Sequence, residues 1–292
     1  MQYRASIGYW QLFCSIKPKH ESIDITCITF LYIFNCFIKS ARFRGKSLPY
    51  TIMISLLLLV SGDIHPNPGP TQTLKMCQIN MRSLQPSDRS VKLDEMYSML
   101  VLENQFDIIC VSETWLDSSI SDAEVELYGY QLFRNDRNRH GGGVAIYAHN
   151  SLPVKKSTNV ENFDIECVAV ELKLNTKRFI ILSCYRPPSS RSEGKEFIEN
   201  FQNLINGIYV EGYDSIFLLG DFNDRCLDWS DDHRNSELGL EFKESIENNL
   251  LFQIISEPTY ISHNYQSFFD LIITDSPGYV QNSGVGFPIG DP

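Results

Sequence analysis

Polar side chains stand at the ends of apolar, strand-like runs at several places in this sequence. These residues are Asn80 after LKMCQI, Glu113 after DIICVS, Tyr185 after FIILSC, Asp221 and Asn223 after SIFLLG, and Asp270 before LIIT. In layered α/β folds, strand ends are where a rigid scaffold presents side chains to a cleft. One such residue means little, because every strand must end in something polar. The repetition, with three carboxylates among the residues, predicts a functional site.

The residue types suit hydrolysis of a phosphodiester assisted by a divalent cation. Mg²⁺ prefers oxygen ligands and keeps several waters, so one or two carboxylates and a substrate phosphate suffice to hold it, and Mn²⁺ is an alternative. Glu113 is the expected carboxylate ligand, with the amide oxygen of Asn80 beside it. Asp221 is expected to accept a proton from the attacking water. Asn223, on the same face of an extended chain, and the phenol of Tyr185 are expected to donate to phosphate oxygens.

Each of these residues also has an ordinary structural interpretation. Asp and Asn favour turns, so Asp221–Asn223 alone could be a turn after a strand. Glu113 could favour a helix N-terminus, and Tyr185 could be a half-buried aromatic residue. Gly141–Gly143 lacks the lysine of a phosphate-binding P-loop and predicts a tight turn before a strand. His233, in the acidic run DWSDDH, is expected in a solvated loop.

The elements that must position these residues alternate between strand-like and helix-like patterns from Thr71 onward. Cys167–Leu174 and Arg178–Tyr185 flank a tight Asn-Thr-Lys turn, which predicts an antiparallel hairpin and therefore a mixed sheet. The other expected strands are Leu74–Asn80, Asp107–Glu113, Gly143–Ala148, Ser215–Asp221 and Phe268–Thr274. The expected helices are Lys92–Glu103, Glu196–Tyr209 and Glu237–Asn248.

Charge is distributed unevenly along the 292 residues. Residues 1–70 hold 7 basic and 3 acidic side chains, so the net charge of −11 leaves −15 on residues 71–292. Such an acidic domain is a poor non-specific DNA binder, because phosphate contacts need Lys and Arg. Contact with nucleic acid therefore requires a local basic rim, for which Arg134, Arg137, Arg139 and Arg186 are the candidates.

The 8 cysteines are scattered and form no C-x-x-C pair, which argues against a zinc site. Several lie in apolar strand-like runs, such as Cys110 in FDIICVSE and Cys184 in FIILSCY. We therefore expect buried free thiols. Free thiols indicate a reducing compartment, the nucleus or the cytoplasm.

The first 70 residues differ in kind from the rest. Their two apolar stretches, residues 25–38 and 52–60, are each shorter than the ~20 residues that span a bilayer. A signal peptide would have its apolar region nearer the terminus and a cleavage site after it. Membrane association or targeting by residues 25–60 is therefore disfavoured. We expect residues 1–70 to be a leader and residues 71–292 to be one domain.

Six motifs follow one another through the expected domain: QINMRSL, SETWLD, GGGVAIY, SCYRPP, LLGDFND and FFDLIIT. Their order and spacing resemble the endonuclease/exonuclease/phosphatase superfamily, and specifically the apurinic-type endonuclease domain of LINE (non-LTR) retrotransposons. The resemblance covers about three-quarters of the chain, from Leu74 onward. It implies an α/β fold in which two mixed β-sheets pack as a sandwich with helices on the outer faces, giving four layers.

The resemblance also implies a role for each site residue. It assigns Asn80 and Glu113 to the metal, Tyr185 to the phosphate, Asp221 and Asn223 to the attacking water and the transition state, and Asp270 to orienting a catalytic histidine. Thr259, in SEPTY, and Arg186, in CYRPP, are weaker candidates for contact with DNA or phosphate.

The sequence departs from the family pattern at one functionally important point. The family pattern ends with Ser-Asp-His before a strand, and that histidine is essential for hydrolysis. This sequence ends GFPIGDP, and none of its 6 histidines occupies that place, although Asp291 could begin the motif. We therefore expect the domain to lack its last strand or strands. We expect this chain to be inactive or severely impaired, and a longer parent to be active.

The segment Asp63–Pro70, DIHPNPGP, closes the leader. Three prolines predict a rigid extended linker. The segment also resembles the 2A-like ribosome-skipping peptides, in which the bond between the last Gly and Pro fails to form, and similar peptides occur upstream of the endonuclease in some LINE-type retrotransposons. His65 stands where the 2A pattern has Glu. The matching positions are Asp63, Asn67, Pro68, Gly69 and Pro70.

Together these resemblances imply a Mg²⁺-dependent endonuclease that nicks DNA and leaves a 3′-hydroxyl for target-primed reverse transcription. The expected partners are DNA and a downstream reverse transcriptase in the parent polyprotein. Two alternatives stay open. The chain could be a catalytically impaired retroelement remnant, or another superfamily member such as a repair endonuclease or a phosphatase.

Overall fold

The computed structural model describes residues 11–17, 73–85, 89–188, 190–223, 229, 235–262 and 265–286. The 2A-like segment, the apolar stretches of residues 25–60, His233 and Asp291 lie outside the described residues. One compact unit contains Gln11–Ile16 and the chain from Leu74 onward. No helix in the described part of the chain is long and apolar enough to cross a membrane.

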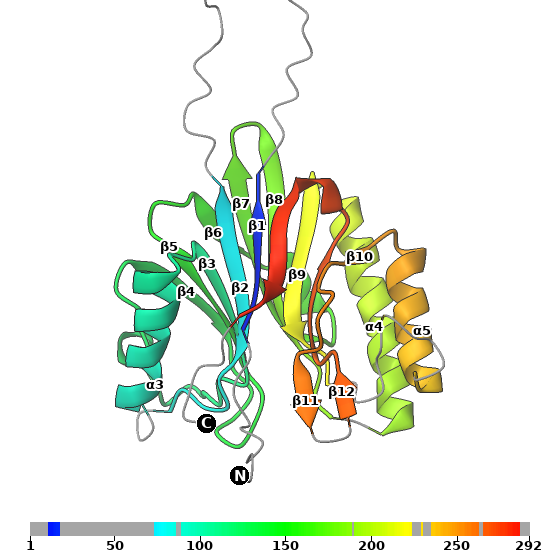
Figure 1. Ribbon diagram of the computed structural model, residues 1–292, viewed down its shortest axis with the longest axis horizontal. Coiled ribbons are helices and arrows are strands. Elements are labelled where there is room, and N and C mark those ends of the chain that lie inside the picture. The colour runs from blue at the N-terminus through cyan, green and yellow to red at the C-terminus, as the bar shows by residue number, and fades with distance from the viewer. Residues whose placement is uncertain are drawn as a thin grey trace, which may run out of the picture. The chain divides into compact units, whose positions relative to one another are not determined.

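The first sheet of this unit has six strands in the order β14-β1-β2-β3-β5-β4 (Figure 1). β2 and β3 are parallel, and every other neighbouring pair is antiparallel. The strands are β1 (Gln11–Ile16), β2 (Leu74–Asn80), β3 (Ile108–Ser112), β4 (Tyr130–Asn135), β5 (Val144–His149) and β14 (Val280–Val285).

The second sheet also has six strands, in the order β10-β13-β9-β8-β7-β6. Here too one pair, β8 and β9, is parallel, and the other neighbours are antiparallel. The strands are β6 (Val154–Ser157), β7 (Glu166–Leu174), β8 (Lys177–Tyr185), β9 (Ser215–Asp221), β10 (Phe252–Gln253) and β13 (Asp270–Thr274). A separate two-stranded ribbon joins β11 (Tyr260–Ser262) to β12 (Tyr265–Ser267).

Helices form the connection within each parallel pair. Both Ser190, before α4 (Arg191–Val210), and Ser236, before α5 (Glu237–Asn248), accept a backbone N–H at the first turn, the usual role of serine at a helix N-cap. β2 is connected to β3 through α3 (Arg89–Met96) and the π-helical segment η2 (Tyr97–Glu103), and β8 to β9 through α4 (Arg191–Val210). α5 is Glu237–Asn248, and short 3₁₀ turns are η3 (Asp122–Glu124), η4 (Asn159–Asn162) and η6 (Pro277–Tyr279).

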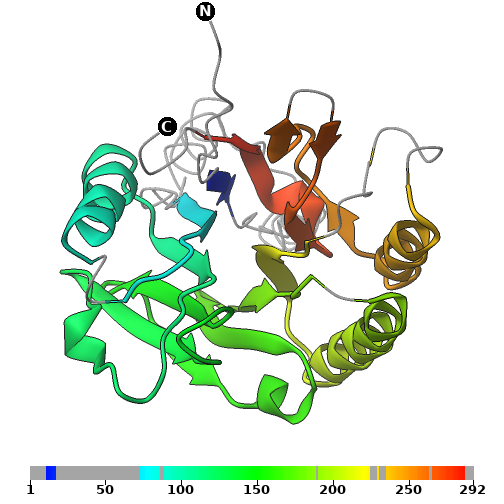
Figure 2. The ribbon, with the colours of Figure 1, turned by 90° about the horizontal axis from the view of Figure 1, so that it is seen from below.

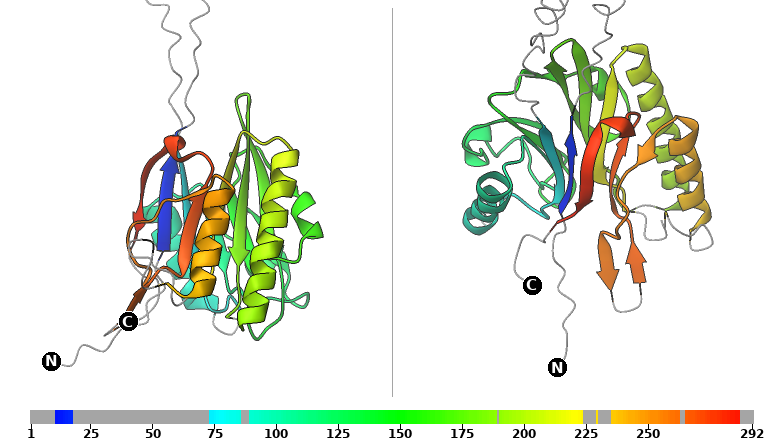
Figure 3. Two further views of the ribbon diagram at one scale, coloured as in Figure 1. Left: turned by 90° about the vertical axis from the view of Figure 1, so that its right-hand side faces the viewer. Right: turned by 45° about the horizontal axis from the view of Figure 1, so that its top comes forward.

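Three apolar cores hold four layers together. The central core lies between the two sheets and includes Ile146 from β5 and Phe179 from β8. An outer core packs α3 and η2 on the first sheet, and another packs α4 and α5 on the second. Figures 2 and 3 show α3 on one outside face and α4 with α5 on the other. The predicted α/β sandwich of two mixed sheets with outer helices is confirmed.

Most of the expected elements are present. β2, β9 and α5 begin and end at the predicted residues. The predicted hairpin is β7–β8, which is antiparallel, and Asn175 in its turn has a φ of 55°. The predicted helix Lys92–Glu103 is divided between α3 and η2.

The structure differs from the expected boundary at residue 71. β1, from residues before that boundary, lies between β2 and β14 and pairs antiparallel with both. Leu12, Cys14 and Ile16 on β1 are buried in the central core. A six-residue strand gives little local signal, and its two partners lie far away in sequence, so the pattern of residues could not reveal this pairing.

Free buried thiols are confirmed for the described cysteines, Cys14, Cys77, Cys110, Cys167 and Cys184. Burial raises the pKa of the Cys14 thiol to about 12, and it raises the pKa of Cys110 as well. Because the thiolate is the reactive form, these cysteines act as small apolar core residues.

Candidate active site

The strands of the two parallel pairs, β2 with β3 and β8 with β9, end at one edge of the sandwich. Asn80 ends β2 opposite Ser112, the last residue of β3, so Glu113 follows directly beside it. In the second sheet Tyr185 pairs with Asp221, and Asp221 pairs with Asp270 across the next ladder. Residues from both sheets therefore gather at one place.

Asn80 links the two sheets at this edge. Its Nδ2 donates to Glu113 Oε1 at 3.0 Å and to Asp221 Oδ2 at 2.7 Å. Its Oδ1 accepts from the backbone N–H of Arg82 at 3.1 Å. One amide thus stands between two carboxylates that are 108 residues apart in the sequence and belong to different sheets.

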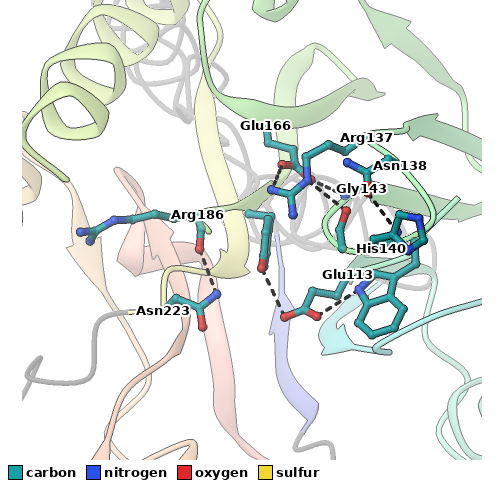
Figure 4. A network of polar contacts seen from close by, with 11 residues as sticks. Glu113, Arg137, Asn138, His140, Gly143, Glu166, Arg186 and Asn223 are labelled. Atoms are coloured by element: carbon teal, nitrogen blue, oxygen red, sulfur yellow. Dashed lines mark hydrogen bonds and ion pairs between the residues drawn. The ribbon is translucent and has the colours of Figure 1, made fainter. Parts of the chain in front are cut away.

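Glu113 is fixed by donors on both of its oxygens. The Trp115 Nε1–H donates to Oε2 at 3.1 Å, and the Tyr185 hydroxyl donates to Oε1 at a long 3.4 Å (Figure 4). The backbone of Glu113 has a φ of 52° and that of Trp115 a φ of 54°. A left-handed backbone at ordinary residues is strained and persists only where the surroundings impose it, which is common at functional sites.

Asp221 is buried, with 3% of its surface exposed. Its Oδ1 accepts the Asn223 backbone N–H at 3.0 Å. Burial is the main cause that raises the pKa of this carboxyl to about 7, and the nearby Glu113 carboxylate raises it further, against the hydrogen bonds from Asn80 and Asn223. A carboxyl with such a pKa exchanges a proton readily near neutrality.

Asp270 lies beside Asp221 and is also buried. Burial and then the charge of Asp221 raise the pKa of Asp270 well above its usual range. Thr259 Oγ1 accepts the backbone N–H groups of Phe269 at 2.9 Å and Asp270 at 3.0 Å. Among the described residues Asp270 Oδ1 has no hydrogen-bond partner. Thr259 thus holds the start of β13, and one Asp270 oxygen is left for another donor.

Asn223 and Arg186 are joined through the backbone. Asn223 Nδ2 donates to the Arg186 carbonyl at 2.9 Å (Figure 4), and the Arg186 N–H donates to the Asp221 carbonyl at 2.9 Å. The Arg186 guanidinium instead lies 5.2 Å from the centre of the Phe197 ring and is buried. The side chains of Arg186 and Thr259 are both buried in the fold, and contact of either residue with DNA or phosphate stays a prediction.

Contacts within the protein also engage the arginines that were expected to form a basic rim, which leaves less positive charge exposed to solvent. Arg134 Nε lies 2.9 Å from Asp122 Oδ1, and its Nη2 donates to the Ile120 carbonyl. Arg139 Nε lies 3.9 Å from Asp117 Oδ2 and is half exposed. Arg137 is more deeply engaged at the site itself and is paired with Glu166. Of the four arginines, Arg139 is the one whose charge reaches solvent most freely.

The donor set fits a hard cation that keeps most of its waters. The described residues contain no group of three or more His, Cys, Asp or Glu side chains arranged to hold a metal. They do contain the carboxylates of Glu113 and Asp221, whose repulsion raises the pKa of Asp221, on either side of the Asn80 amide. A cation there would relieve that repulsion. To serve as a ligand Asn80 must turn its amide so that Oδ1 faces the carboxylates.

Three further residues belong to the site and were not among the predicted ones. Trp115 follows Glu113 within SETW, so the motif itself contained this signal. Gln78 is buried on the same face of β2 as Asn80, donates to Ser112 Oγ at 2.9 Å and lowers the pKa of Asp270. Glu166 stands opposite Tyr185 in the β7–β8 register, a placement that only the hairpin pairing reveals.

A cavity of about 400 Å³ opens beside Tyr185, between the end of β8 and the start of α4. Glu166 and Tyr185 line it on the site side, and Phe197 lines it on the helix side. Asp164, Glu193 and Glu196 also line it, and with Glu166 they outnumber Arg186, the one cationic residue among the described residues of the lining, so the charge of the cavity disfavours a phosphate group. We therefore expect a substrate phosphate on the Glu113 side of Tyr185.

Comparison with known proteins gives a family and several similar structures. Residues 77–291 match the model of the Endonuclease/Exonuclease/phosphatase family. The endonuclease domain of TRAS1, a telomere-specific non-LTR retrotransposon, superposes with a TM-score of 0.50 and 15% identity over 67% of this chain and 82% of that one. The likeness shows a shared fold. No curated protein sequence matches the chain.

Two nucleases from other sources are similar to a slightly lower degree. The 3′-5′ exonuclease NExo from Neisseria meningitidis has a TM-score of 0.49 and 16% identity over 67% of this chain and 84% of that chain. An AP endonuclease from Archaeoglobus fulgidus has a TM-score of 0.47 and 16% identity over 70% of this chain and 87% of that chain.

Proposed function

Since the chain belongs to the endonuclease/exonuclease/phosphatase family, we propose that it is a Mg²⁺-dependent phosphodiesterase that nicks DNA as the endonuclease of a LINE-type retrotransposon. The observation that carries the proposal is the Asn80 amide, which stands between Glu113 and Asp221 where the ends of the two sheets meet. The order of the SETWLD, GGGVAIY and LLGDFND motifs supports the retrotransposon assignment.

Glu113 and Asn80 would hold Mg²⁺, with Mn²⁺ as an alternative. When bound, the cation would neutralise charge on the phosphate and on the Glu113–Asp221 pair. The Tyr185 hydroxyl, already directed at Glu113, would donate to a phosphate oxygen. These residues would orient the phosphate with its scissile bond toward Asp221.

Asp221 would accept the proton of the attacking water. The water oxygen forms a bond to phosphorus, and the bond from phosphorus to the 3′-oxygen breaks in line, so the products are a 5′-phosphate and a 3′-oxygen that is then protonated. The pKa of this carboxyl is about 7 without the cation, and the bound cation would lower it, which favours the ionised form that accepts the proton near neutral pH. Asn223 would donate to the phosphate oxygens as charge develops on them.

Asp270 would orient the group that protonates the leaving oxygen. Its Oδ1 is buried and without a hydrogen-bond partner among the described residues, which suits the acceptor for an imidazole N–H. The resulting 3′-hydroxyl is the primer that a reverse transcriptase needs. DNA and a downstream reverse transcriptase are therefore the proposed partners.

A plasmid assay tests the proposal. The protein, extended through the Ser-Asp-His segment that the resemblance leads us to expect, should convert supercoiled plasmid to the nicked form with Mg²⁺. Glu113→Ala and Asp221→Asn should each reduce the rate by about 10²-fold or more, because the first removes the carboxylate that would hold the cation and the second removes the group that would accept the proton of the attacking water. The exposed Glu199→Ala and Asp94→Asn are matched controls and should nick normally.

Excess EDTA should stop the reaction, and added Mg²⁺ should restore it. Nicking that survives both substitutions and EDTA would refute the proposal. Faster cleavage of abasic-site oligonucleotides, or release of phosphate from phosphoinositides, would instead favour a repair enzyme or a phosphatase of the same family. Absence of turnover on all these substrates, in a folded protein, would favour a retroelement remnant.

A further inference from the structure

Arg137, in the loop between β4 and β5, lies against the Tyr185 ring. Its guanidinium carbon is 5.5 Å from the ring centre. Its Nη1 lies 3.1 Å from Glu166 Oε2, and its Nε donates to the Gly141 carbonyl at 3.0 Å. Figure 4 shows Arg137 and Glu166 beside the Glu113 end of the site. The loop is therefore attached to the β7–β8 hairpin next to Tyr185.

Glu166 holds the arginine from the neighbouring strand. It stands directly opposite Tyr185 in the β7–β8 register, so its side chain starts beside the tyrosine. Its Oε2 pairs with Arg137, and its Oε1 accepts the Gly143 backbone N–H. Burial raises the pKa of Glu166, and these two donors oppose the rise. One carboxylate thus fixes both the arginine and the end of its loop.

The glycines of the loop make this packing possible. Gly142 and Gly143 have φ angles of 70° and 82°, which favour glycine. A Cβ on Gly142 would overlap the Arg137 guanidinium and the Glu166 carboxylate, and a Cβ on Gly143 would overlap the Thr114 hydroxyl. The GGG run is therefore explained by close contact with Arg137, Glu166 and the loop that carries Glu113.

The same loop is bonded to the Glu113 segment on its other side. The Trp115 backbone N–H donates to the Gly142 carbonyl at 2.9 Å, and that of Thr114 donates to the Gly143 carbonyl at 3.1 Å. Arg137 thus extends from a loop bonded beside Glu113 to the face of Tyr185. In contrast, the Tyr185 hydroxyl itself reaches Glu113 only through a 3.4 Å bond.

We propose that Arg137, held by Glu166, is a positioning residue that sets the Tyr185 hydroxyl against Glu113 and the substrate phosphate. The role of Tyr185 toward phosphate rests on the function proposed above. The contact of Arg137 with the Tyr185 ring does not rest on that function, because the contact is a property of the fold. A guanidinium over an aromatic face stabilises one orientation of the ring.

The chain contains a matched control for this arrangement. Arg178 lies 4.6 Å from the centre of the Tyr213 ring, and its Nη2 lies 3.6 Å from Glu171 Oε2. Arg178 is the second residue of β8 and Tyr185 is its last, so this second Arg–Glu–Tyr group lies at the far end of the hairpin. Arg178→Met therefore removes the same kinds of contact without touching the candidate site.

Nicking kinetics of the extended protein described under the proposed function give the first test. Arg137→Met should lower kcat at least 10-fold with KM little changed, Arg137→Lys should recover part of the loss, and Arg178→Met should be neutral. In a Tyr185→Phe background Arg137→Met should have little further effect, because the hydroxyl that it positions is gone. Equal losses in both backgrounds, or a rise in KM alone, would overturn the proposal in favour of direct contact between Arg137 and phosphate.

The second test needs no catalytic turnover. In protein labelled with ¹³C at the tyrosine ζ carbon, the Tyr185 signal is the one that Tyr185→Phe removes. Arg137→Met and Glu166→Gln should shift it, whereas Arg178→Met should shift the Tyr213 signal and leave Tyr185 in place. An unchanged Tyr185 signal overturns the proposal. A shifted signal in a protein that nicks no DNA supports it and rejects only the proposed function.

Discussion

At the residue scale, the chemistry of the site depends on carboxylates that share a buried edge. Asp221 and Asp270 are neighbours in the β9–β13 register, and Glu113 raises the pKa of both. The sequence predicted these residue types and their places at strand ends. It could not predict the pKa shifts, because burial and the distances between charges depend on how the sheets pack.

The stability of the metal-free protein should depend on Asp221 in a defined pH range. The pKa of Asp221 is about 7 in the fold and 3.8 as its ordinary value, so the folded chain holds a proton that the unfolded chain releases between these values. Its contribution is complete below about pH 4 and is lost as pH rises to about 7. Each unit of pKa difference corresponds to about 1.4 kcal/mol.

Urea unfolding in EDTA measures this effect. The free energy of unfolding of Asp221→Asn, relative to the unsubstituted protein, should increase as pH rises from about 4 to about 7 and then level off. Asp275→Asn is a control from outside the site. Like Asp221→Asn, it removes a carboxylate that accepts a backbone hydrogen bond, in this case from the Ile216 N–H at 2.9 Å. A constant difference between Asp221→Asn and the unsubstituted protein across this range would show that folding does not raise the pKa of Asp221.

Mg²⁺ should stabilise the fold through the same carboxylates. A ligand that binds only the folded chain raises the free energy of unfolding, by about 2.7 kcal/mol at 100 times its Kd. The effect should be larger at pH 8 than at pH 5, because protonation of Asp221 competes with the cation. Glu113→Gln should remove most of the stabilisation and Glu199→Gln none. Equal stabilisation of all three proteins in urea unfolding would place the cation elsewhere.

At the element scale, strands and helices with strong local patterns were predictable and weakly patterned edges were not. β2, β9 and α5 match their predicted bounds because each is a continuous apolar or amphipathic run. β4 is polar enough to read as loop, and all but its last residue are only partly buried. β14, with the sequence VQNSGV, has no buried residue, and it is a strand mainly because it pairs with β1.

The loop between β4 and β5 allows a test at this scale. Gly142→Ala should disturb Arg137 and so lower nicking, because the new Cβ would overlap the guanidinium. Gly212→Ala is the matched control, since Gly212 has a similar φ of 68° and open space around the Cβ position. Both changes should cost about 1 kcal/mol of stability through the positive φ. Equal nicking rates for the two variants would show that the loop tolerates the displacement of Arg137.

At the scale of the whole molecule, the two sheets repeat one plan. Each contains a single parallel pair joined by a helical connection, and the ends of the two pairs form the site. The bond from Asn80 to Asp221 crosses 141 residues of sequence. No local pattern predicts such a contact. Only the order of the motifs, through resemblance to a family, placed these residues together before the structure did.

β1 comes from the first residues of the chain and lies between β2 and β14, so the stability of the first sheet should depend on it. Leu12 is fully buried between the sheets, so Leu12→Ala should cost about 2–5 kcal/mol, the usual range for a buried leucine. Leu250→Ala is the control, since Leu250 is 75% exposed and should change stability by less than about 0.5 kcal/mol. Unfolding in urea measures both. Similar small effects would mean that β1 is not needed for the stability of the sheet, and a protein beginning after it would then fold unaided. A large effect at Leu12 alone would mean that β2 and β14 depend on a strand that precedes residues 63–70 in the sequence.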